Sequence, residues 1–269
     1  HLVLRAEWPD KTMLRNFLAM ELIRAGTWLA APRTEFVHVR RNGQFHGLML
    51  WTERIDGDFL RSNGYDPDGS LYEADPPLAH AGPGGSLRPL PDRAEYAIVY
   101  QHHRGDVDYD DLIELIEGLL QSDPDTLTAR LDAEVSMDDL VVYLAVQAGI
   151  QGQDHIRKNY YLYRDLAADL EDRWIVFPWD LDLTFGHLWS EAEEIFGEAI
   201  ITDADLFVGV RVEEHDFYNQ LIDAILTRPA PRAAFLDALD RLSTTVLARE
   251  FLEPLAQNAV CRMTPELLM

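Results

Sequence analysis

The spacing of apolar residues predicts a strand and then a helix at the start of the sequence. Residues 1–6 have the character of a β-strand, and we expect its pairing partners to lie upstream of the sequence. Apolar residues then recur every three or four positions over 14–25, which is the spacing of one face of an α-helix. Asp10 or Thr12 can cap the start of this helix, and Gly26 ends it.

A β-hairpin is predicted after this helix. Residues 34–41 and 44–54 are strand-like runs, and the dipeptide Asn42-Gly43 between them is typical of a two-residue hairpin turn, because both residue types tolerate a positive φ angle. The strand, the helix and the hairpin together predict a small α+β lobe over residues 1–61, which is truncated if the partners of the first strand precede it.

A connector and a larger, mainly helical lobe are predicted next. Residues 62–95 are rich in glycine, proline and aspartate and have no sustained periodicity, so we predict a connecting loop. The periodicity becomes helical in the large lobe, which we assign to residues 96–269. Apolar residues line one face of 112–120, and Ser136-x-x-Asp139 has the sequence of a capping box, which predicts the start of another helix.

Two β-rich runs interrupt the helical pattern of the large lobe. Residues 160–164 and 174–179 flank an acidic turn and predict a second hairpin. The C-terminal stretch predicts amphipathic helices that are interrupted by Pro229 and Pro231. We therefore expect an α+β, bilobal fold that spans residues 1–269 as one domain.

Composition excludes several classes of protein. The 269 residues carry a net charge of −24, from 47 acidic and 23 basic residues, and Lys11 and Lys158 are the only lysines. A field of this sign repels phosphate backbones, so we expect no nucleic-acid partner. No apolar run reaches the roughly 18 residues of a membrane span, so we expect no membrane insertion. The single cysteine, Cys261, excludes an intrachain disulfide and a cysteine-based zinc cluster within this sequence.

The strongest chemical signal flanks the second predicted hairpin. Asp154 is followed five residues later by Asn159, then by the hairpin, and then by Asp180 and Asp182. Phosphoryl transfer from a nucleotide requires a carboxylate that orients the acceptor hydroxyl and oxygen ligands for a divalent cation. Protein kinases carry these groups in the same order along the chain. We therefore hypothesise a phosphoryl-transfer site in which these side chains meet in one cleft.

The same residues also fit a structural interpretation. Asp154 and Asn159 can cap turns, and Asp180 and Asp182 can form an exposed strand end in so acidic a chain. Against this, Asp180 follows an apolar run, where an acid destabilises the fold unless it is paired or bound to a metal. Lys158 lies within the same loop, where its charge would suit a transferred phosphate, although an ordinary surface lysine is an equal alternative.

An acidic residue in the first helix gives an independent expectation. Glu21 falls in the middle of the apolar face, so it requires a cation, and Arg5 at the end of the preceding strand is the expected partner. Such a pair would correspond to the strand cation and helix glutamate that position nucleotide phosphates in protein kinases. The alternatives are a purely structural ion pair and a glutamate that reaches the surface.

Motifs spread over nearly the whole chain resemble the CotH kinases, a secreted or spore-coat branch of the protein-kinase-like fold. The resemblance is most specific after residue 150. The residues that carry it are Asp10-x-Thr12-x-x-Arg15-Asn16, Ala31-Pro32-Arg33-Thr34, Asn42-Gly43-x-x-x-Gly47-Leu48 with Glu53 following, Ser70-Leu71-Tyr72, the stretch from Asp154 to Tyr163, and Pro178-Trp179-Asp180-Leu181-Asp182-Leu183-Thr184-Phe185-Gly186.

This resemblance implies an ATP-dependent kinase that phosphorylates serine or threonine in protein substrates, with Mg²⁺ or Mn²⁺ as cofactor. It implies that Asp154 is the catalytic aspartate and that Asn159 and Asp180 are metal ligands. Glu53 would lie near the strand that contacts the adenine, and Asp182 would support the first metal or bind a second. It also implies a location in the spore coat, in the secreted fraction or at the cell surface.

Two departures from the family pattern leave other functions open. The family usually has lysine where this chain has Arg5, and arginine is bulkier and forked, so it is less suited to reach two phosphates as a point charge. Glu73 stands where lysine is common. The first alternative is therefore a catalytically weak, kinase-like surface or coat scaffold. The second is a metal-dependent phosphohydrolase that uses Asp154, Asp180 and Asp182 around two cations.

Overall fold

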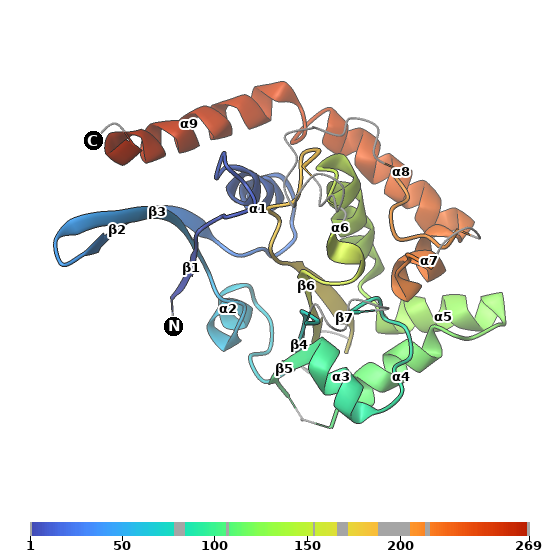
Figure 1. Ribbon diagram of the computed structural model, residues 1–269. Coiled ribbons are helices and arrows are strands. Elements are labelled where there is room, and N and C mark those ends of the chain that lie inside the picture. The colour runs from blue at the N-terminus through green and yellow to red at the C-terminus, as the bar shows by residue number, and fades with distance from the viewer. Residues whose placement is uncertain are drawn as a thin grey trace.

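Two antiparallel sheets organise the chain (Figure 1). The computed structural model describes residues 2–77, 84–105, 108–152, 154–165, 172–187, 205–212 and 216–267. Within these ranges, a three-stranded sheet has the strand order β1-β3-β2, a four-stranded sheet has the order β5-β4-β6-β7, and nine α-helices accompany them. This is the α+β class that the sequence predicts. The division into two lobes, with a connector between them, stays a prediction.

The small sheet contains β1 (Val3–Arg5), β2 (Thr34–Arg41) and β3 (Gln44–Thr52). β2 and β3 form the predicted hairpin, and Asn42 and Gly43 have the positive φ angles, 53° and 82°, that its turn requires. β1 pairs antiparallel with β3, where Arg5 lies opposite Leu50. The expectation that the partners of this strand lie upstream is therefore wrong for this edge: the hairpin itself supplies the partner strand.

Helix α1 (Arg15–Gly26) packs against both β2 and the C-terminal helix α9 (Arg249–Leu267), which passes over it in Figure 1. The ring of Phe17 from α1 lies 4.9 Å from that of Phe36 in β2, measured between ring centres. Met263 of α9 belongs to the same buried cluster. The first and last helices of the chain thus cover one sheet together.

Both residues predicted to cap α1 hold the turn that leads into it. The buried Asp10 carboxylate accepts hydrogen bonds from the main-chain N–H of Arg15, at 2.9 Å, and of Thr12, at 3.0 Å. The Thr12 hydroxyl oxygen accepts a bond from the Leu14 N–H at 3.2 Å. The N-cap position itself is Leu14, whose side chain makes no cap bond, so neither predicted residue is the N-cap. The bond to Arg15 satisfies an N–H group of the first helical turn, and the other two hold the turn before it.

The four-stranded sheet contains β4 (Ser70–Ala74), β5 (Tyr100–Arg104), β6 (Tyr160–Arg164) and β7 (Trp174–Pro178). The β6–β7 hairpin is predicted correctly. The prediction of an unbroken loop over 62–95 is wrong at 70–74, because this segment forms β4, an inner strand paired with both β5 and β6. Four of its five residues are buried, so it lacks the alternation that identifies a half-exposed strand. Residues 78–83 of the predicted loop lie outside the described residues.

The other helices cover the second sheet and one another. No described helix has both the length and the apolar character of a membrane span. Their bounds are α2 (Gly57–Ser62), α3 (Arg93–Val99), α4 (Asp110–Gly118), α5 (Pro124–Glu134), α6 (Met137–Gly149), α7 (Gln220–Leu226) and α8 (Pro229–Ser243).

Two details of these helices differ from the sequence predictions. Ser136 precedes α6 as predicted, but its hydroxyl donates to the Asp139 carboxylate at 2.8 Å instead of closing a capping box with the main chain. Asp139 also accepts a bond from the indole of Trp28 at 2.7 Å, so its side chain is drawn toward a distant segment. Pro229 and Pro231 occupy the first turn of α8, where a missing N–H breaks no helical hydrogen bond, so they begin this helix and do not interrupt it.

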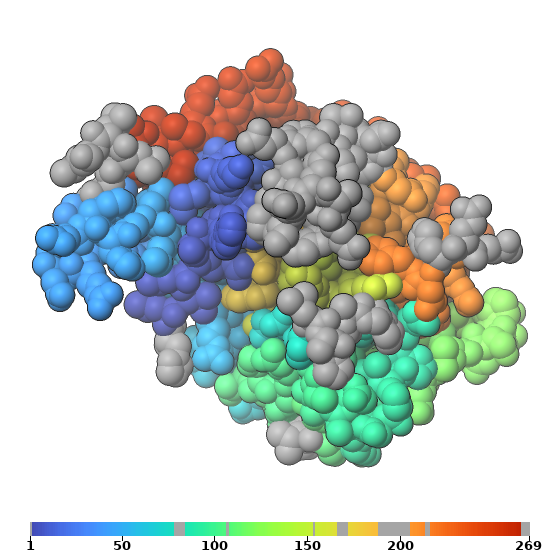
Figure 2. Space-filling model, in the orientation of Figure 1, coloured from blue at the N-terminus to red at the C-terminus, as the bar shows by residue number. Residues whose placement is uncertain are grey.

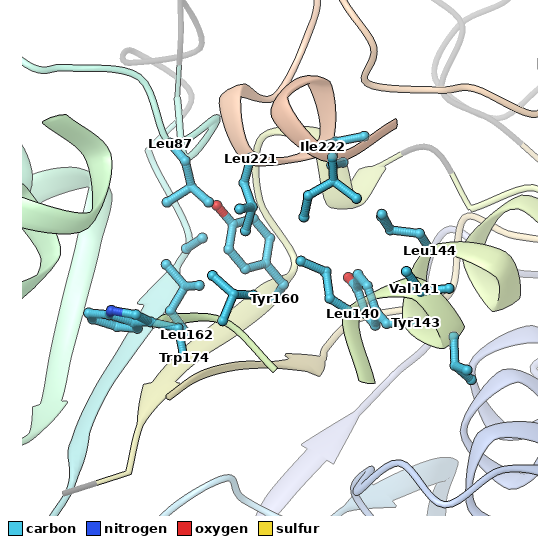
Figure 3. Close-up of a cluster of buried hydrophobic side chains, with 14 of the residues drawn as sticks. Leu87, Leu140, Val141, Tyr143, Leu144, Tyr160, Leu162, Trp174, Leu221 and Ile222 are labelled. Atoms are coloured by element: carbon cyan, nitrogen blue, oxygen red, sulfur yellow. The ribbon is translucent and has the colours of Figure 1, made fainter. Parts of the chain in front are cut away.

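The main hydrophobic core lies between α6, β6 and α7 (Figure 3). Tyr143 of α6, Tyr160 of β6 and Leu221 of α7 are each buried there. The interior of α6 is buried almost continuously from Leu140 to Gln147, which explains why its sequence is apolar on more than one face. This core fixes the segment between α6 and β6, where the predicted chemical residues lie.

Candidate active site

The β6–β7 hairpin brings Asn159 and Asp180 to the same end of the sheet. Tyr160 pairs with Pro178, so the residues just outside this pair face each other, and the N–H of Trp179 donates to the carbonyl of Asn159 at 3.2 Å. Asn159 and Asp180 have positive φ angles of 63° and 52°. Asparagine and aspartate adopt this left-handed region more readily than most other residues, and there the chain turns sharply out of both strands.

Asp154 and Lys158 complete this end of the hairpin. Asp154–Ile156 forms a 3₁₀ turn (η2) that folds the loop back, so that Lys158 Nζ lies 3.1 Å from an Asp154 carboxylate oxygen. The side-chain amide of Asn159 donates to the same Asp154 oxygen, at 3.0 Å, and to the carbonyl of Asp180, at 3.3 Å. The structure therefore brings Asp154, Lys158, Asn159 and Asp180 together at one end of the hairpin, which we call the hairpin end.

Arg5 contacts this group from the small sheet. Its guanidinium forms an ion pair with Asp180, lies 3.3 Å from a carboxylate oxygen of Glu7, and lies 5.7 Å from the ring centre of Trp179. In the space-filling view the blue N-terminal segment adjoins the yellow segment that contains the hairpin (Figure 2). The acid that follows the apolar run of β7 is thus half-buried and paired with a cation.

The predicted pair between Arg5 and Glu21 is wrong. Glu21 forms an ion pair with Arg24, one helical turn away, at 2.8 Å. The order of strands explains the difference, because β1 and β2 lie on opposite sides of β3 and α1 packs against β2. Neighbouring strands are about 4.8 Å apart, so two strand spacings separate Arg5 from the strand that α1 covers.

Glu53 also has a partner other than the predicted nucleotide site. Two guanidinium nitrogens of Arg33 contact its carboxylate, at 2.6 and 3.1 Å. Arg33 and Glu21 both line a groove of about 300 Å³ whose wall includes Trp51 and Arg262. Glu21 and Arg33, the partner of Glu53, therefore share one groove, which we call the α1 groove.

Glu7 and Asn16, which have no predicted role, connect the N-terminal segment to the loop after β7. Asn16 is fully buried, its side-chain amide donates to Glu7 at 3.2 Å, and its side-chain oxygen accepts the N–H of Leu181 at 3.2 Å. Asn16 thereby fixes the main chain between Asp180 and Asp182. A polar residue among apolar neighbours in the first turn of α1 is the sequence signal that could have identified it.

Buried acids give this site an unusual electrostatic character. Burial raises the pKa of the Glu7 carboxyl to about 7. The charge of Arg5 and the hydrogen bond from Asn16 oppose this rise, whereas the charges of Asp182 and Asp10 add to it. Burial also raises the pKa of Asp182, where Arg5 and Lys158 oppose the shift and Asp154 and Asp10 add to it. The negative charges thus disfavour one another, and a bound cation would relieve this repulsion.

Asp75 is a further carboxylate that the sequence did not indicate. It follows β4, whose last carbonyl, on Ala74, accepts the N–H of Asn159 at 2.9 Å. Partial desolvation and the charge of Glu73 raise the pKa of Asp75, whereas Lys158 and Arg5 lower it. Asp75 therefore lies within the field of the same two cations as Asp182. Recognising it would have required β4, which the sequence pattern does not reveal.

The donor set fits a magnesium or manganese ion that is shared with a nucleotide. Among the described residues no group of three or more histidine, cysteine, aspartate and glutamate side chains is arranged as a metal cage. Magnesium at nucleotide sites characteristically uses only one or two protein carboxylates together with phosphate oxygens and water. Asp180 and the side-chain oxygen of Asn159 are of the required oxygen type, and the neighbouring Asp182 adds negative charge.

Comparisons with known proteins agree with the motifs. The family model described as CotH kinase protein matches residues 1–268. The inner spore coat protein H of Bacillus subtilis (strain 168) is 26% identical over 271 residues, which cover 99% of this chain and 68% of that protein. The alignment thus includes both the small sheet and the hairpin end. The family resemblance that the motifs predict is confirmed.

Proposed function

The chain belongs to the CotH kinase family, and from this premise we propose that it transfers the γ-phosphate of ATP to a serine or threonine hydroxyl of a protein substrate, with Mg²⁺ or Mn²⁺ as cofactor. The observation that carries the proposal is the double contact of the Asn159 amide with Asp154 and with the Asp180 main chain. This contact joins the acid that would orient the acceptor to the acid that would hold the cation. The name of the relative supports a location in the spore coat.

In this proposal each residue at the hairpin end has a separate task. Asp154 accepts a hydrogen bond from the acceptor hydroxyl and aims its oxygen at the phosphorus atom. Lys158, already 3.1 Å from Asp154, places a positive charge beside the phosphoryl group in transfer. Asn159 and Asp180 would hold the cation, which supplies charge neutralisation on the β- and γ-phosphates. Glu21, which pairs with Arg24 and not with Arg5, takes no part in these steps.

Asp182 and Asn16 support the residues that would hold the cation. Asp182 is only 6% exposed, so its carboxylate adds negative charge to the cation site without reaching bulk solvent. Asn16 holds the N–H of Leu181 and so fixes the loop that carries both acids. Fixed groups of this kind stabilise a developing charge without reorganising during the reaction.

A catalytically weak scaffold is the second candidate, and one observation favours it. The guanidinium of Arg5 already forms an ion pair with Asp180, the acid that would hold the cation. Arginine presents a fixed fork of donors to a carboxylate and releases it less readily than lysine does. Binding of a cation and ATP would have to compete with this ion pair. The alternative of a two-cation phosphohydrolase has no comparable support, because the described acids form no such cage.

The two candidates are separated by comparing isosteric variants at the site with a matched surface variant. We expect wild-type protein to consume ATP and label a protein acceptor only with Mg²⁺ or Mn²⁺ present. Asp154→Asn and Asp180→Asn remove one charge each and should lower transfer by about a thousandfold. The control Asp58→Asn removes an exposed carboxylate on α2 and should leave transfer unchanged.

The readouts are label transfer from γ-labelled ATP and nucleotide binding by calorimetry. Full transfer by Asp180→Asn would remove the proposed metal role of this residue. Wild-type protein that binds no nucleotide at millimolar Mn²⁺ would favour the scaffold. Binding without transfer to any acceptor would also favour the scaffold, with the nucleotide as its ligand.

A further inference from the structure

Three segments that are far apart in the sequence meet beside the 154–159 loop. The N–H of Gly85 donates to the carbonyl of Arg157 at 2.6 Å, and a Cβ atom at this glycine would lie only 2.6 Å from the same oxygen. The side-chain amide of Asn219 donates to the carbonyl of Ile156 at 2.9 Å, and the N–H of Gln220 donates to Ser86 at 2.8 Å. The segments 84–88 and 216–220 are therefore held against the loop that carries Asp154.

This junction gathers three arginines, which we call the arginine cluster: Arg88, Arg157 and Arg211. The Arg88 guanidinium pairs with the Asp216 carboxylate at 2.9 Å and lies 4.7 Å from the ring centre of Tyr218. Arg211 lies 5.3 Å from the same ring. The Arg157 guanidinium donates to the Asp216 carbonyl at 3.2 Å. In Figure 2 the turquoise, yellow-green and orange segments that contribute these residues adjoin on one face.

The surroundings hold these cations in place. Arg157 lies 4.2 Å from the ring centre of Phe217, which is 41% exposed, so the guanidinium stacks on a ring at the surface. Stacking on aromatic faces restricts a guanidinium while leaving its edge able to donate hydrogen bonds. Burial and the nearby charge of Arg88 lower the pKa of Arg157, whereas the charge of Asp216 raises it. Like charges are thus kept close together in a chain whose net charge is −24.

We propose that the arginine cluster binds an anionic side chain of the protein substrate, a carboxylate or a phosphorylated residue, beside the hydroxyl that receives the phosphate. This inference rests on the proposed function, because it assigns a substrate class to the same site. Arg157 directly follows the 3₁₀ turn that begins at Asp154, so the cluster adjoins the loop that would orient the acceptor hydroxyl. Asp216, whose side chain is 72% exposed, shows that Arg88 holds a carboxylate at the surface.

Kinetics with three sets of peptides test the substrate preference. Each peptide has one serine, flanked at successive positions by glutamate, by phosphoserine or by lysine. Because each lost ion pair to a fixed guanidinium corresponds to about tenfold in affinity, we expect KM to be about tenfold lower for the anionic peptides than for the lysine peptides. Equal KM values, or a lower KM for lysine peptides, would overturn the proposal. The better of the two anionic sets identifies carboxylate or phosphate as the recognised group.

Two variants with opposite expected effects separate recognition from a structural role. Arg88→Ala removes a cation and should raise KM for the anionic peptides about tenfold, with kcat and the KM for ATP unchanged. Asp216→Asn removes the internal carboxylate that shares Arg88 and should lower the same KM. A purely structural cluster would make both variants worse or leave both unchanged. The control Arg61→Ala removes an exposed arginine on α2 that pairs with Asp58.

Direct binding keeps this test independent of catalysis. Fluorescence anisotropy of a labelled phosphoserine peptide should show binding to wild-type protein that weakens with added salt and is about tenfold weaker in Arg88→Ala. If wild-type protein transfers phosphate but this binding is absent, the proposed function stands and the arginine cluster has no such role. If binding follows the cluster but no acceptor is phosphorylated, the proposed function fails and the anion site remains.

Discussion

The hairpin end and the α1 groove both place carboxylates beside arginines, but they do so in different ways. In the α1 groove the partners are local, because Glu21 pairs with Arg24 three residues away, and Arg33 of the groove pairs with Glu53 across neighbouring strand ends. At the hairpin end, Arg5 and Asp180 are 175 residues apart in sequence. The fold must be complete before that second kind of pair can form.

This difference indicates which acids serve solvation and which serve chemistry. A local, partly exposed ion pair contributes little to stability, since water screens it and two long side chains lose freedom. At the hairpin end, Glu7 and Asp182 are buried among other acids, which destabilises their charged forms. Such an arrangement is retained at a functional site more often than at a structural one.

The largest expected effect is at Asn159, which joins the two acids of the hairpin end. Asn159→Ala should lower phosphate transfer by about a thousandfold, since it removes a proposed metal ligand and the contact with Asp154. Because Asn159 has a positive φ angle, Asn159→Gly should be equally inactive while avoiding backbone strain. Transfer is measured at saturating ATP over a range of Mn²⁺ concentrations, with the exposed Asn63→Ala as control. An active glycine variant would contradict the proposed role.

The next-largest expected effect is the pH dependence that Glu7 gives to the free energy of unfolding. Its pKa is raised from 4.5 to about 7 in the folded state, so the unfolded chain releases this proton at a lower pH than the native protein does. Stability should therefore fall as pH rises from about 4.5 to 7, by on the order of 3 kcal/mol from this group. Asp182, whose pKa is also raised, adds a loss of the same sign.

Urea unfolding at pH 5 and pH 8 measures this loss. Glu7→Gln cannot ionise, so it should resemble the wild type at pH 5 and be more stable than the wild type at pH 8. Equal pH dependence in the two proteins would show that Glu7 is ionised normally in the fold. Glu250→Gln, at an exposed residue in the first turn of α9, is the matched control.

The smallest effect is expected in the α1 groove. Glu21→Gln removes a partly exposed ion pair within one helix and should change the free energy of unfolding by only about 0.3 kcal/mol. Phosphate transfer and the KM for ATP should stay within twofold of wild type, as measured in the same assays. A large rise in the KM for ATP would instead place nucleotide binding at the α1 groove, and the acids there would then serve chemistry.

Local signals in the sequence predict the elements that local physics determines. Asn42-Gly43 and the two runs around residues 160–178 are sufficient for both hairpins, because turn chemistry and strand character act over a few residues. The spacing from Asp154 to Asn159 and Asp180 indicates which side chains meet, because the register of one hairpin fixes their positions. The arrangement of the proposed catalytic group therefore follows from signals within about thirty residues of the chain.

The remaining features depend on long-range pairing. β4 is not predicted because a short inner strand buried on both faces lacks alternation, and Asp75 escapes notice with it. The partner of Arg5 is predicted wrongly because it depends on the strand order β1-β3-β2, which no local pattern specifies. Glu7 has no periodic signal, and its raised pKa arises only when the chain folds around it and brings Asp10 and Asp182 close.

The position of β1 at a sheet edge has a consequence for motion at the hairpin end. In the described sheet β1 pairs with β3 over three residues, and a pairing of so few hydrogen bonds opens locally at a smaller free energy than the whole domain requires. Each such opening would withdraw Arg5 and leave Asp180 to other ligands. Separation of β1 from β3 would therefore make the Asp180 carboxylate more available to a cation.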